Sequence, residues 1–307
     1  MLAALDVIAP IFLVIGLGAW LRRIGLLSAE HAGLLSRFTF RVAAPLFLFH
    51  RVGRRPPEGG DHLTVVAVIV GVSVLTAAVT YALTRRAGPR RVGVLAQGAF
   101  RSNTVFFGLP VVTQAYGEEA VARAALVIGT MVVTYNLLGA VVLALPRERV
   151  SAGSRELWRG LGRDMVTNPL VLGIVGGILR SGAGWTPPGF LDRTLDLVGR
   201  TALPLALLSI GAGLEVRDLP REWRPALAIS VVKLALYPAA IGLMLHWAGL
   251  STAELRVPVV LLASPCAVMA YVMAREMNGD EQLASAIVLG STLLSVVSSV
   301  AWLTILG

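Results

Sequence analysis

The sequence predicts an all-α integral membrane protein with ten transmembrane helices in two inverted five-helix repeats. Three observations support this fold class. Hydrophobic residues make up 56% of the 307 residues and charged residues only 15%, and the mean hydropathy is +0.75, well above that of a soluble domain. Ten apolar segments follow one another along the chain, and the second five resemble the first five.

A helix needs about 20 apolar residues to cross the hydrocarbon core of a bilayer. The ten segments run over residues 4–21, 35–49, 63–83, 92–115, 121–145, 166–179, 191–214, 225–247, 255–273 and 283–306. The second and sixth are short. We expect the first segment to be a retained helix, because Arg22 and Arg23 follow it and no basic residue precedes it, unlike in a cleaved signal peptide.

The distribution of basic residues predicts the orientation in the membrane. Basic residues near helix ends concentrate on the cytoplasmic side. Loops that follow odd-numbered segments hold 16 Lys and Arg, whereas loops that follow even-numbered segments hold 7. This pattern predicts a multi-pass protein of the cytoplasmic (inner) membrane with both termini extracytoplasmic. It also explains the net charge of +9 without a nucleic-acid partner.

The longest polar stretch, residues 146–165, divides the ten segments five and five. It predicts a first repeat over 1–145, a cytoplasmic linker over 146–165 and a second repeat over 166–307. Because five is an odd number, the second copy enters the membrane in the opposite orientation, which is the plan of many secondary transporters.

Direct sequence matches support the duplication. A shift of 159 residues superposes RVAAPL from Arg41 on RTALPL from Arg200, and a shift of 162 superposes GEEAVARA from Gly117 on GDEQLASA from Gly279. Scattered Leu and Val would match by chance between apolar helices, but Pro, Arg and Gly in the same order indicate a repeat.

The fourth and ninth segments contain residues that are unusual at mid-membrane depth. The fourth includes RSNTVFFGLP from Arg101 to Pro110, and the ninth includes ASPCAVMA with Pro265 at the position that matches Asn103. Proline lacks a backbone donor and clashes with the preceding turn, so we expect both helices to break. The N-termini of half-helices carry partial positive charge and free N–H groups, which suit a carboxylate.

These two segments and the fifth supply the predicted anion site. Its candidate substrate-binding residues are Arg101, Ser102, Asn103, Thr104, Asn136, Ser264, Pro265 and Cys266, and its crossover prolines are Pro110 and Pro265. The amide and hydroxyl groups can donate hydrogen bonds, and an arginine at this depth is usually functional. The alternatives are that Pro110 is an ordinary kink, that Asn103 and Asn136 bond between helices, and that Arg101 snorkels to the interface.

Lys233, the only lysine of the chain, lies inside the eighth segment and is a candidate for coupling or charge compensation. Ion pairing or snorkelling is the alternative. No cofactor and no metal are expected, since the four His are scattered and the chain holds a single Cys. The sequence contains none of the motifs HExxH, GxSxG or GxxxxGK[ST], so we expect no enzyme activity.

The sequence resembles the auxin efflux carrier family, which includes plant auxin exporters and bacterial carriers of dicarboxylates. PIFLVIGLGAWLRRIGLLSAEHAGLLSRFTFRVAAPLFLF is similar to the first two helices of the family, and RSNTVFFGLPVVTQAYGEEA to its broken fourth helix. KLALYP and SPCAVMAYVMAREMNGDEQLASAIVLGSTLLS resemble its eighth to tenth helices. The resemblance covers essentially the whole chain.

The resemblance implies crossed, broken helices four and nine that frame the substrate site, with Asn103 contacting the substrate carboxylate and Pro110 and Pro265 marking the crossover. It implies a scaffold of helices 1, 2, 6 and 7 that forms a homodimer, and a transport domain of helices 3–5 and 8–10 that moves as an elevator. The expected function is secondary transport of a small organic anion through the lipid bilayer. A passive anion channel and a non-transporting membrane sensor are the alternatives.

Overall fold

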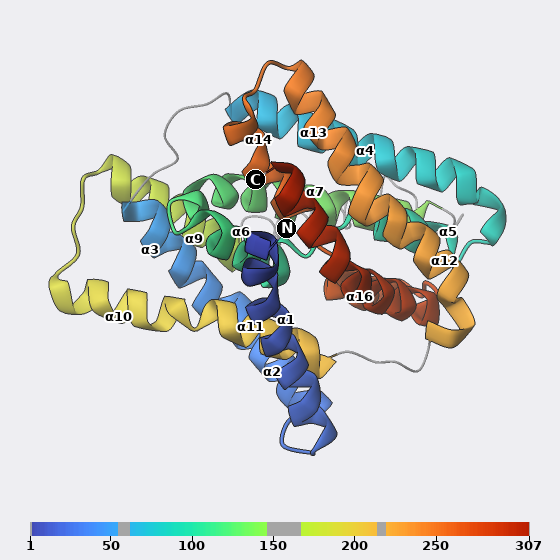
Figure 1. The fold of residues 1–307 in the computed structure, drawn as a ribbon, viewed down its shortest axis with the longest axis horizontal. Helices are drawn as coiled ribbons and strands as arrows, with labels where there is room; N and C mark the ends of the chain where they lie inside the picture. Colours follow the sequence, from blue (N-terminus) through green and yellow to red (C-terminus); the bar gives the residue numbers. More distant parts are fainter. Residues whose placement is uncertain (1, 55–61, 146–166, 214–218, 307) are drawn as a thin grey trace. The chain divides into compact units, whose positions relative to one another are not determined.

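The computed structural model of the protein describes residues 2–54, 62–145, 167–213 and 219–306 (Figure 1). This part of the chain forms helices and turns and no strand, which confirms the all-α class. The predicted linker at 146–165 lies outside the described residues. All ten apolar segments of the sequence overlap helices, while the inverted relation between the two halves stays a prediction.

Seven of the described helices are long and apolar enough to cross a membrane. They run over Ala4–Arg23, Ala29–Arg54, His62–Ala87, Ala120–Ala144, Gly189–Gly213, Arg221–Trp247 and Glu281–Leu306. Two shorter apolar helices run over Thr104–Tyr116 and Pro169–Gly182. Several predicted spans are therefore interrupted or short, as expected for helices that end within the membrane.

The chain forms two compact units, each assembled from three separate stretches. Unit 1 comprises Met1–Gly60, Val105–Gly129 and Asp164–Leu214, and unit 2 comprises Asp61–Thr104, Thr130–Arg163 and Glu215–Gly307. Helix α7 (Ala120–Ala144) begins in the first and ends in the second.

The remaining helices divide between the two units. Unit 1 contains α1 (Leu2–Arg23), α2 (Ala29–Phe38), η1 (Thr39–Ala43), α3 (Ala44–Arg54), all but the first residue of η3 (Thr104–Gly108), α6 (Leu109–Tyr116), α9 (Pro169–Gly182), α10 (Gly189–Arg200) and α11 (Ala202–Gly213). Unit 2 contains α4 (His62–Thr84), η2 (Arg85–Ala87), α5 (Val92–Phe100), α12 (Leu219–Val231), η4 (Val232–Leu236), α13 (Tyr237–Trp247), α14 (Thr252–Leu262), α15 (Val268–Glu276) and α16 (Glu281–Leu306).

Small residues allow the helices of unit 1 to pack closely. Helix α1 lies against α11, and α3 lies against α9. A Cβ atom on Gly211 would lie 1.8 Å from the carbonyl oxygen of Ile15, and one on Gly18 would lie 2.3 Å from that of Leu208. No side chain fits at either position. The α1–α11 contact therefore depends on glycine, as is common where helices pack in membranes.

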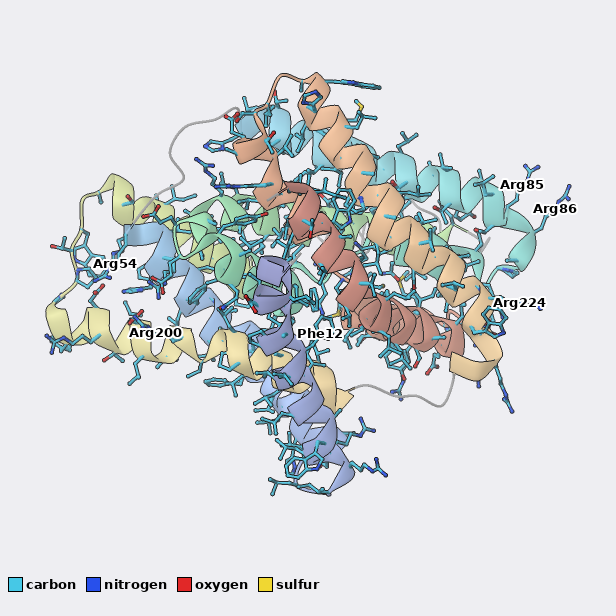
Figure 2. All side chains as sticks on the ribbon, in the orientation of Figure 1. Phe12, Arg54, Arg85, Arg86, Arg200 and Arg224 are labelled. Carbon is cyan, nitrogen blue, oxygen red and sulfur yellow. The ribbon has the colours of Figure 1, made fainter. Side chains whose placement is uncertain are left out.

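In unit 2, α16 packs along α12, and α4 packs against α5 and α13 (Figure 1). Gly93 brings α5 close to α7, since a Cβ atom there would lie 2.5 Å from the carbonyl oxygen of Val142. Figure 2 shows three exposed arginines of this unit at helix ends, Arg85 and Arg86 just beyond the end of α4 and Arg224 near the beginning of α12.

Three π-helical turns share one feature, a proline at the second position of the α-helix that follows. Pro45 follows η1, Pro110 follows η3 and Pro238 follows η4. Proline has no N–H, so the carbonyl four residues earlier loses its helical partner. After η4 that carbonyl belongs to Leu234, and the indole Nε1–H of Trp302 on α16 donates to it at 2.7 Å.

This hydrogen bond gives the first testable prediction. Replacing Trp302 with Phe should lower the thermal stability of the protein, because the buried Leu234 carbonyl then loses its donor, at a cost of about 1–3 kcal/mol. Trp247→Phe is the matched control, since that indole on α13 is 71% exposed. The melting temperatures of both purified variants in detergent decide the question. Equal values would contradict the assignment.

Candidate functional site

Two helices of unit 2 stop inside the unit. Helix α5 ends at Phe100 and helical structure resumes at Thr104, while α14 ends at Leu262 and α15 begins at Val268. The fourth and ninth apolar segments are therefore broken, as their sequences predict. Every residue between these helix ends lies in unit 2.

The two interruptions pair with each other through the backbone. The N–H of Asn103 donates to the carbonyl of Pro265 at 2.8 Å, and the N–H of Ala267 donates to the carbonyl of Arg101 at 3.1 Å. The pairing is antiparallel. Each broken helix thus supplies partners for the other, which meets the requirement that backbone groups be satisfied where water is scarce.

Side chains form hydrogen bonds with backbone groups that this pairing does not include. Pro265 cannot donate to the carbonyl of Leu261, and the Ser264 hydroxyl does so instead at 2.8 Å. The N–H of Cys266 donates to Ser291 Oγ on α16 at 3.0 Å. Ser264 therefore stabilises the end of α14, and its single hydroxyl proton is already committed.

The carbonyl of Leu262, the last residue of α14, accepts two hydrogen bonds. The Ser102 hydroxyl donates to it at 2.8 Å and Lys233 Nζ at 2.7 Å. A cation at a helix C-terminus is favourable because the helix dipole is negative there. This contact joins η4 to the paired interruptions.

Lys233 is completely buried, so it does not snorkel. Its ammonium lies 5.0 Å from the centre of the Tyr237 ring. Within the described residues it forms no ion pair with a carboxylate. Neither alternative considered for Lys233 is observed in this part of the chain, where its ammonium contacts a carbonyl and an aromatic face.

Arg101 is also buried, with 4% of its surface exposed, which excludes snorkelling in this structure. Its guanidinium donates to the Tyr135 carbonyl at 2.7 Å and to Asn136 Oδ1 at 2.9 Å, both on α7. Asn136 therefore bonds between helices. Gly139 makes room for this arrangement, because a Cβ atom there would lie 3.0 Å from Arg101 Nη1.

Asn103 and Thr104 are both buried at the beginning of the second half of the broken helix. Pro110 does not lie at the interruption, which corrects the expectation that it enforces the break. It is the second residue of α6, which directly continues the π-helical turn η3 through a helical Gly108, so the chain stays helical across Pro110. The pairing with Pro265, rather than Pro110, accompanies the break.

Three buried hydroxyl groups near the site are not singled out by the sequence. Tyr237 OH on α13 lies 2.7 Å from Ser73 Oγ on α4 and 3.4 Å from Tyr135 OH on α7. Tyrosines within apolar helices resemble ordinary core residues in the sequence. Only the general need of a buried Tyr for a hydrogen-bond partner could have indicated them.

Unit 1 shows how buried cations are neutralised elsewhere in this chain. Arg51 pairs with Glu118 and, at 3.2 Å, with Asp196. Arg180 pairs with Asp192 at 3.2 Å. Each of these arginines therefore has a carboxylate partner.

Arg101 and Lys233, which we name the site cations, differ from these arginines. In the described part of the chain neither contacts an Asp or a Glu side chain. The same residues include no group of three His, Cys, Asp or Glu placed to hold a metal ion. The paired interruptions thus lie beside two buried cations whose hydrogen-bond acceptors, in the described part of the chain, are carbonyl and amide oxygens.

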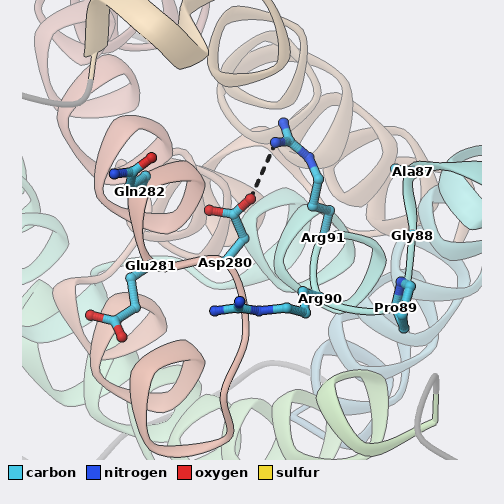
Figure 3. A pocket seen from close by; sticks show the side chains of 8 residues that line it. All are labelled: Ala87, Gly88, Pro89, Arg90, Arg91, Asp280, Glu281 and Gln282. Atoms are coloured by element: carbon cyan, nitrogen blue, oxygen red, sulfur yellow. Dashed lines mark hydrogen bonds and ion pairs between the residues drawn. The ribbon is translucent and has the colours of Figure 1, made fainter.

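A second candidate is a hollow of about 670 Å³ between the α4–α5 and α15–α16 connections, lined by Ala87, Gly88, Pro89, Arg90, Arg91, Asp280, Glu281 and Gln282 (Figure 3). Arg91 donates to Glu222 at 2.6 Å and to Asp280 at 3.2 Å. The hydrogen bond with Glu222 raises the pKa of Arg91. Two carboxylates, Asp280 and Glu281, line the hollow together with its two arginines, so it favours anion binding less than the paired interruptions do.

Comparison with known proteins bears on the function. The family model described as "Membrane transport protein" matches residues 3–303. An "Uncharacterized transporter" of Methanothermobacter thermautotrophicus is 27% identical over 98% of both chains. A Rhizobium meliloti protein named "Putative malonate transporter" is 26% identical over 94% of this chain and 91% of its own. "Auxin efflux carrier component 8" of Arabidopsis thaliana is 21% identical over 92% of this chain and 91% of its own. The chain therefore belongs to the membrane transport protein family, that of the auxin efflux carriers, whose members are multi-pass membrane transporters and not enzymes.

Proposed function

We propose that the protein is a secondary carrier of a small organic anion, a carboxylate, across the cytoplasmic membrane. The observation that supports this most is the burial of the site cations without a carboxylate partner among the described residues. A buried charge is costly unless an opposite charge compensates it. A bound anion would supply that compensation. The name of the Rhizobium meliloti relative supports a carboxylate in particular.

The hydrogen bonds suggest which side chains would contact the anion. The hydroxyls of Ser102 and Ser264 donate their protons to carbonyl groups of α14. We therefore propose that these two serines stabilise the interrupted helices. Asn103 and Thr104 begin the second half of the broken helix, where the helix dipole favours an anion. We assign Asn103 as the principal contact to the carboxylate.

We further propose that the carrier has ten spans in two inverted repeats and works as an elevator. Residues 101–104 and 263–267 all belong to unit 2, so one body could carry the site across the membrane. The scaffold of predicted helices 1, 2, 6 and 7 would form the homodimer. The transport domain would comprise predicted helices 3–5 and 8–10.

Transport assays with malonate as the probe test this function. Purified protein in liposomes should take up radiolabelled malonate with saturation, and unlabelled malonate inside should accelerate uptake by counterflow. Malonamide, which has a similar shape but no charge, should not compete. Flux without saturation or counterflow would favour the channel alternative, and binding without flux the sensor. Failure of malonate and of other mono- and dicarboxylates to bind would overturn the proposal.

Asn103→Ala should weaken malonate binding by about 10- to 150-fold, because losing a hydrogen bond to a charged group costs about 1.5–3 kcal/mol. The backbone bond of residue 103 to Pro265 stays, so the fold should persist. Asn168→Ala is the matched control. Its side chain caps α9 by accepting from the N–H groups of Leu170 and Val171, so this change should lower stability and leave affinity intact. Affinity of Asn103→Ala within twofold of wild type would place the site elsewhere.

The orientation is tested by cysteine labelling in a variant that lacks Cys266, the only cysteine. Ala87 and Ala183 are exposed positions in the α4–α5 and α9–α10 connections. A membrane-impermeant maleimide should label Ala183→Cys in intact cells, but Ala87→Cys only after permeabilisation. The reverse pattern would show that the termini are cytoplasmic.

A further inference from the structure

We infer that Tyr237 is a positioning residue for both site cations. It holds Lys233 directly through its ring, and it acts on Arg101 indirectly, through the contact of its hydroxyl with Tyr135. This inference rests on the proposed function, because its main consequence is for anion affinity. Tyr237 is 1% exposed and is the first residue of α13, directly after the π-helical turn that carries Lys233.

The ring of Tyr237 acts on Lys233. The ammonium lies 5.0 Å from the ring centre and donates at 2.7 Å to the carbonyl of Leu262. A cation–π contact is strongest when both partners are removed from water, as they are here. The ring and the carbonyl together hold the ammonium at the end of α14, beside the paired interruptions.

The hydroxyl of Tyr237 lies between the hydroxyls of Ser73 and Tyr135. Counting the available protons indicates which group donates in each contact. Each hydroxyl has one proton to donate. Ser73 gives its proton to the carbonyl of Ile69 at 2.6 Å, so it accepts from Tyr237 across their 2.7 Å contact. Tyr237 then has no proton left, so a hydrogen bond across the 3.4 Å contact must be donated by Tyr135, whose hydroxyl also interacts with Ser102.

This direction connects Tyr237 to the second site cation. The backbone carbonyl of Tyr135 accepts a hydrogen bond from the guanidinium of Arg101 at 2.7 Å. The centre of the Tyr135 ring lies 6.0 Å from the same guanidinium. Since the proton of Tyr237 is committed to Ser73, the phenol does not donate to an anion. Tyr237 instead affects binding through the site cations. Its hydroxyl contacts also connect α4, α7 and α13 beside the site.

Malonate affinity tests the hydroxyl arm. Tyr237→Phe keeps the ring and should raise the Kd for malonate about fivefold. Tyr135→Phe breaks the same link, so the double variant should bind no more weakly than the weaker single variant. Tyr271→Phe is the control, because this partly buried tyrosine packs against the core of the same unit. If Tyr237→Phe does not give monodisperse protein, Ser73→Ala removes the acceptor of the same chain and should also raise the Kd.

A ligand-free measurement tests the ring arm. Lys233 is the only lysine, so protein labelled with ¹³C at lysine Cε gives one signal in NMR spectra. Tyr237→Leu removes the ring and should shift this signal, because ring-current shielding is lost. Tyr271→Leu should leave it in place.

The two measurements, malonate affinity and the lysine NMR signal, distinguish failure of this inference from failure of the proposed function. Wild-type protein that binds malonate, together with a Kd for Tyr237→Phe within twofold of it, would overturn the inference and leave the function intact. Wild-type protein that does not bind malonate would count against the proposed function, and the lysine signal then decides. An unmoved signal in Tyr237→Leu overturns the positioning role, and a shifted signal supports it.

Discussion

The rest of this structure depends on one constraint: the backbone N–H and C=O groups need hydrogen-bond partners where two apolar helices stop. Water is not available inside a bilayer to bond free N–H and C=O groups, so an interrupted helix persists only if protein atoms replace it. Here the two interruptions supply each other with partners, from Asn103 to Pro265 and from Ala267 to Arg101. The side chains around them complete the set.

This constraint also determines where the positive charges lie. The last carbonyls of a helix such as α14 have no N–H partner within the helix, and the negative end of a helix dipole attracts a cation. Lys233 binds there through Leu262, and Arg101 binds the carbonyl of Tyr135. Both cations are thus held by neutral acceptors. In the proposed function a bound anion would compensate their charge, which connects the stability of the break to the proposed anion specificity.

Glycine and proline have distinct roles in positioning these elements. Gly139 leaves space for the guanidinium of Arg101, and Gly211 allows α1 and α11 to touch. Pro110 and Pro238 follow π-helical turns without ending the helix. After η4 the lost hydrogen bond is replaced by the indole of Trp302. At Pro238, therefore, a donor from another helix replaces the missing N–H and the helix continues.

The sequence by itself determined the membrane class, the order of the apolar segments, the two broken helices and the family, because each depends on local hydropathy or on short motifs such as that from Arg101 to Pro110. The tertiary structure alone decided that the fourth segment breaks before Pro110, that neither site cation meets a carboxylate within the described residues, and that Tyr237 and Ser73 lie beside the site. These features depend on contacts between residues far apart in the chain, from Ser73 to Tyr237 and from Lys233 to Leu262. Spacing within one helix carries no information about such contacts, because a buried tyrosine or lysine fits an apolar pattern equally well whichever partner it meets.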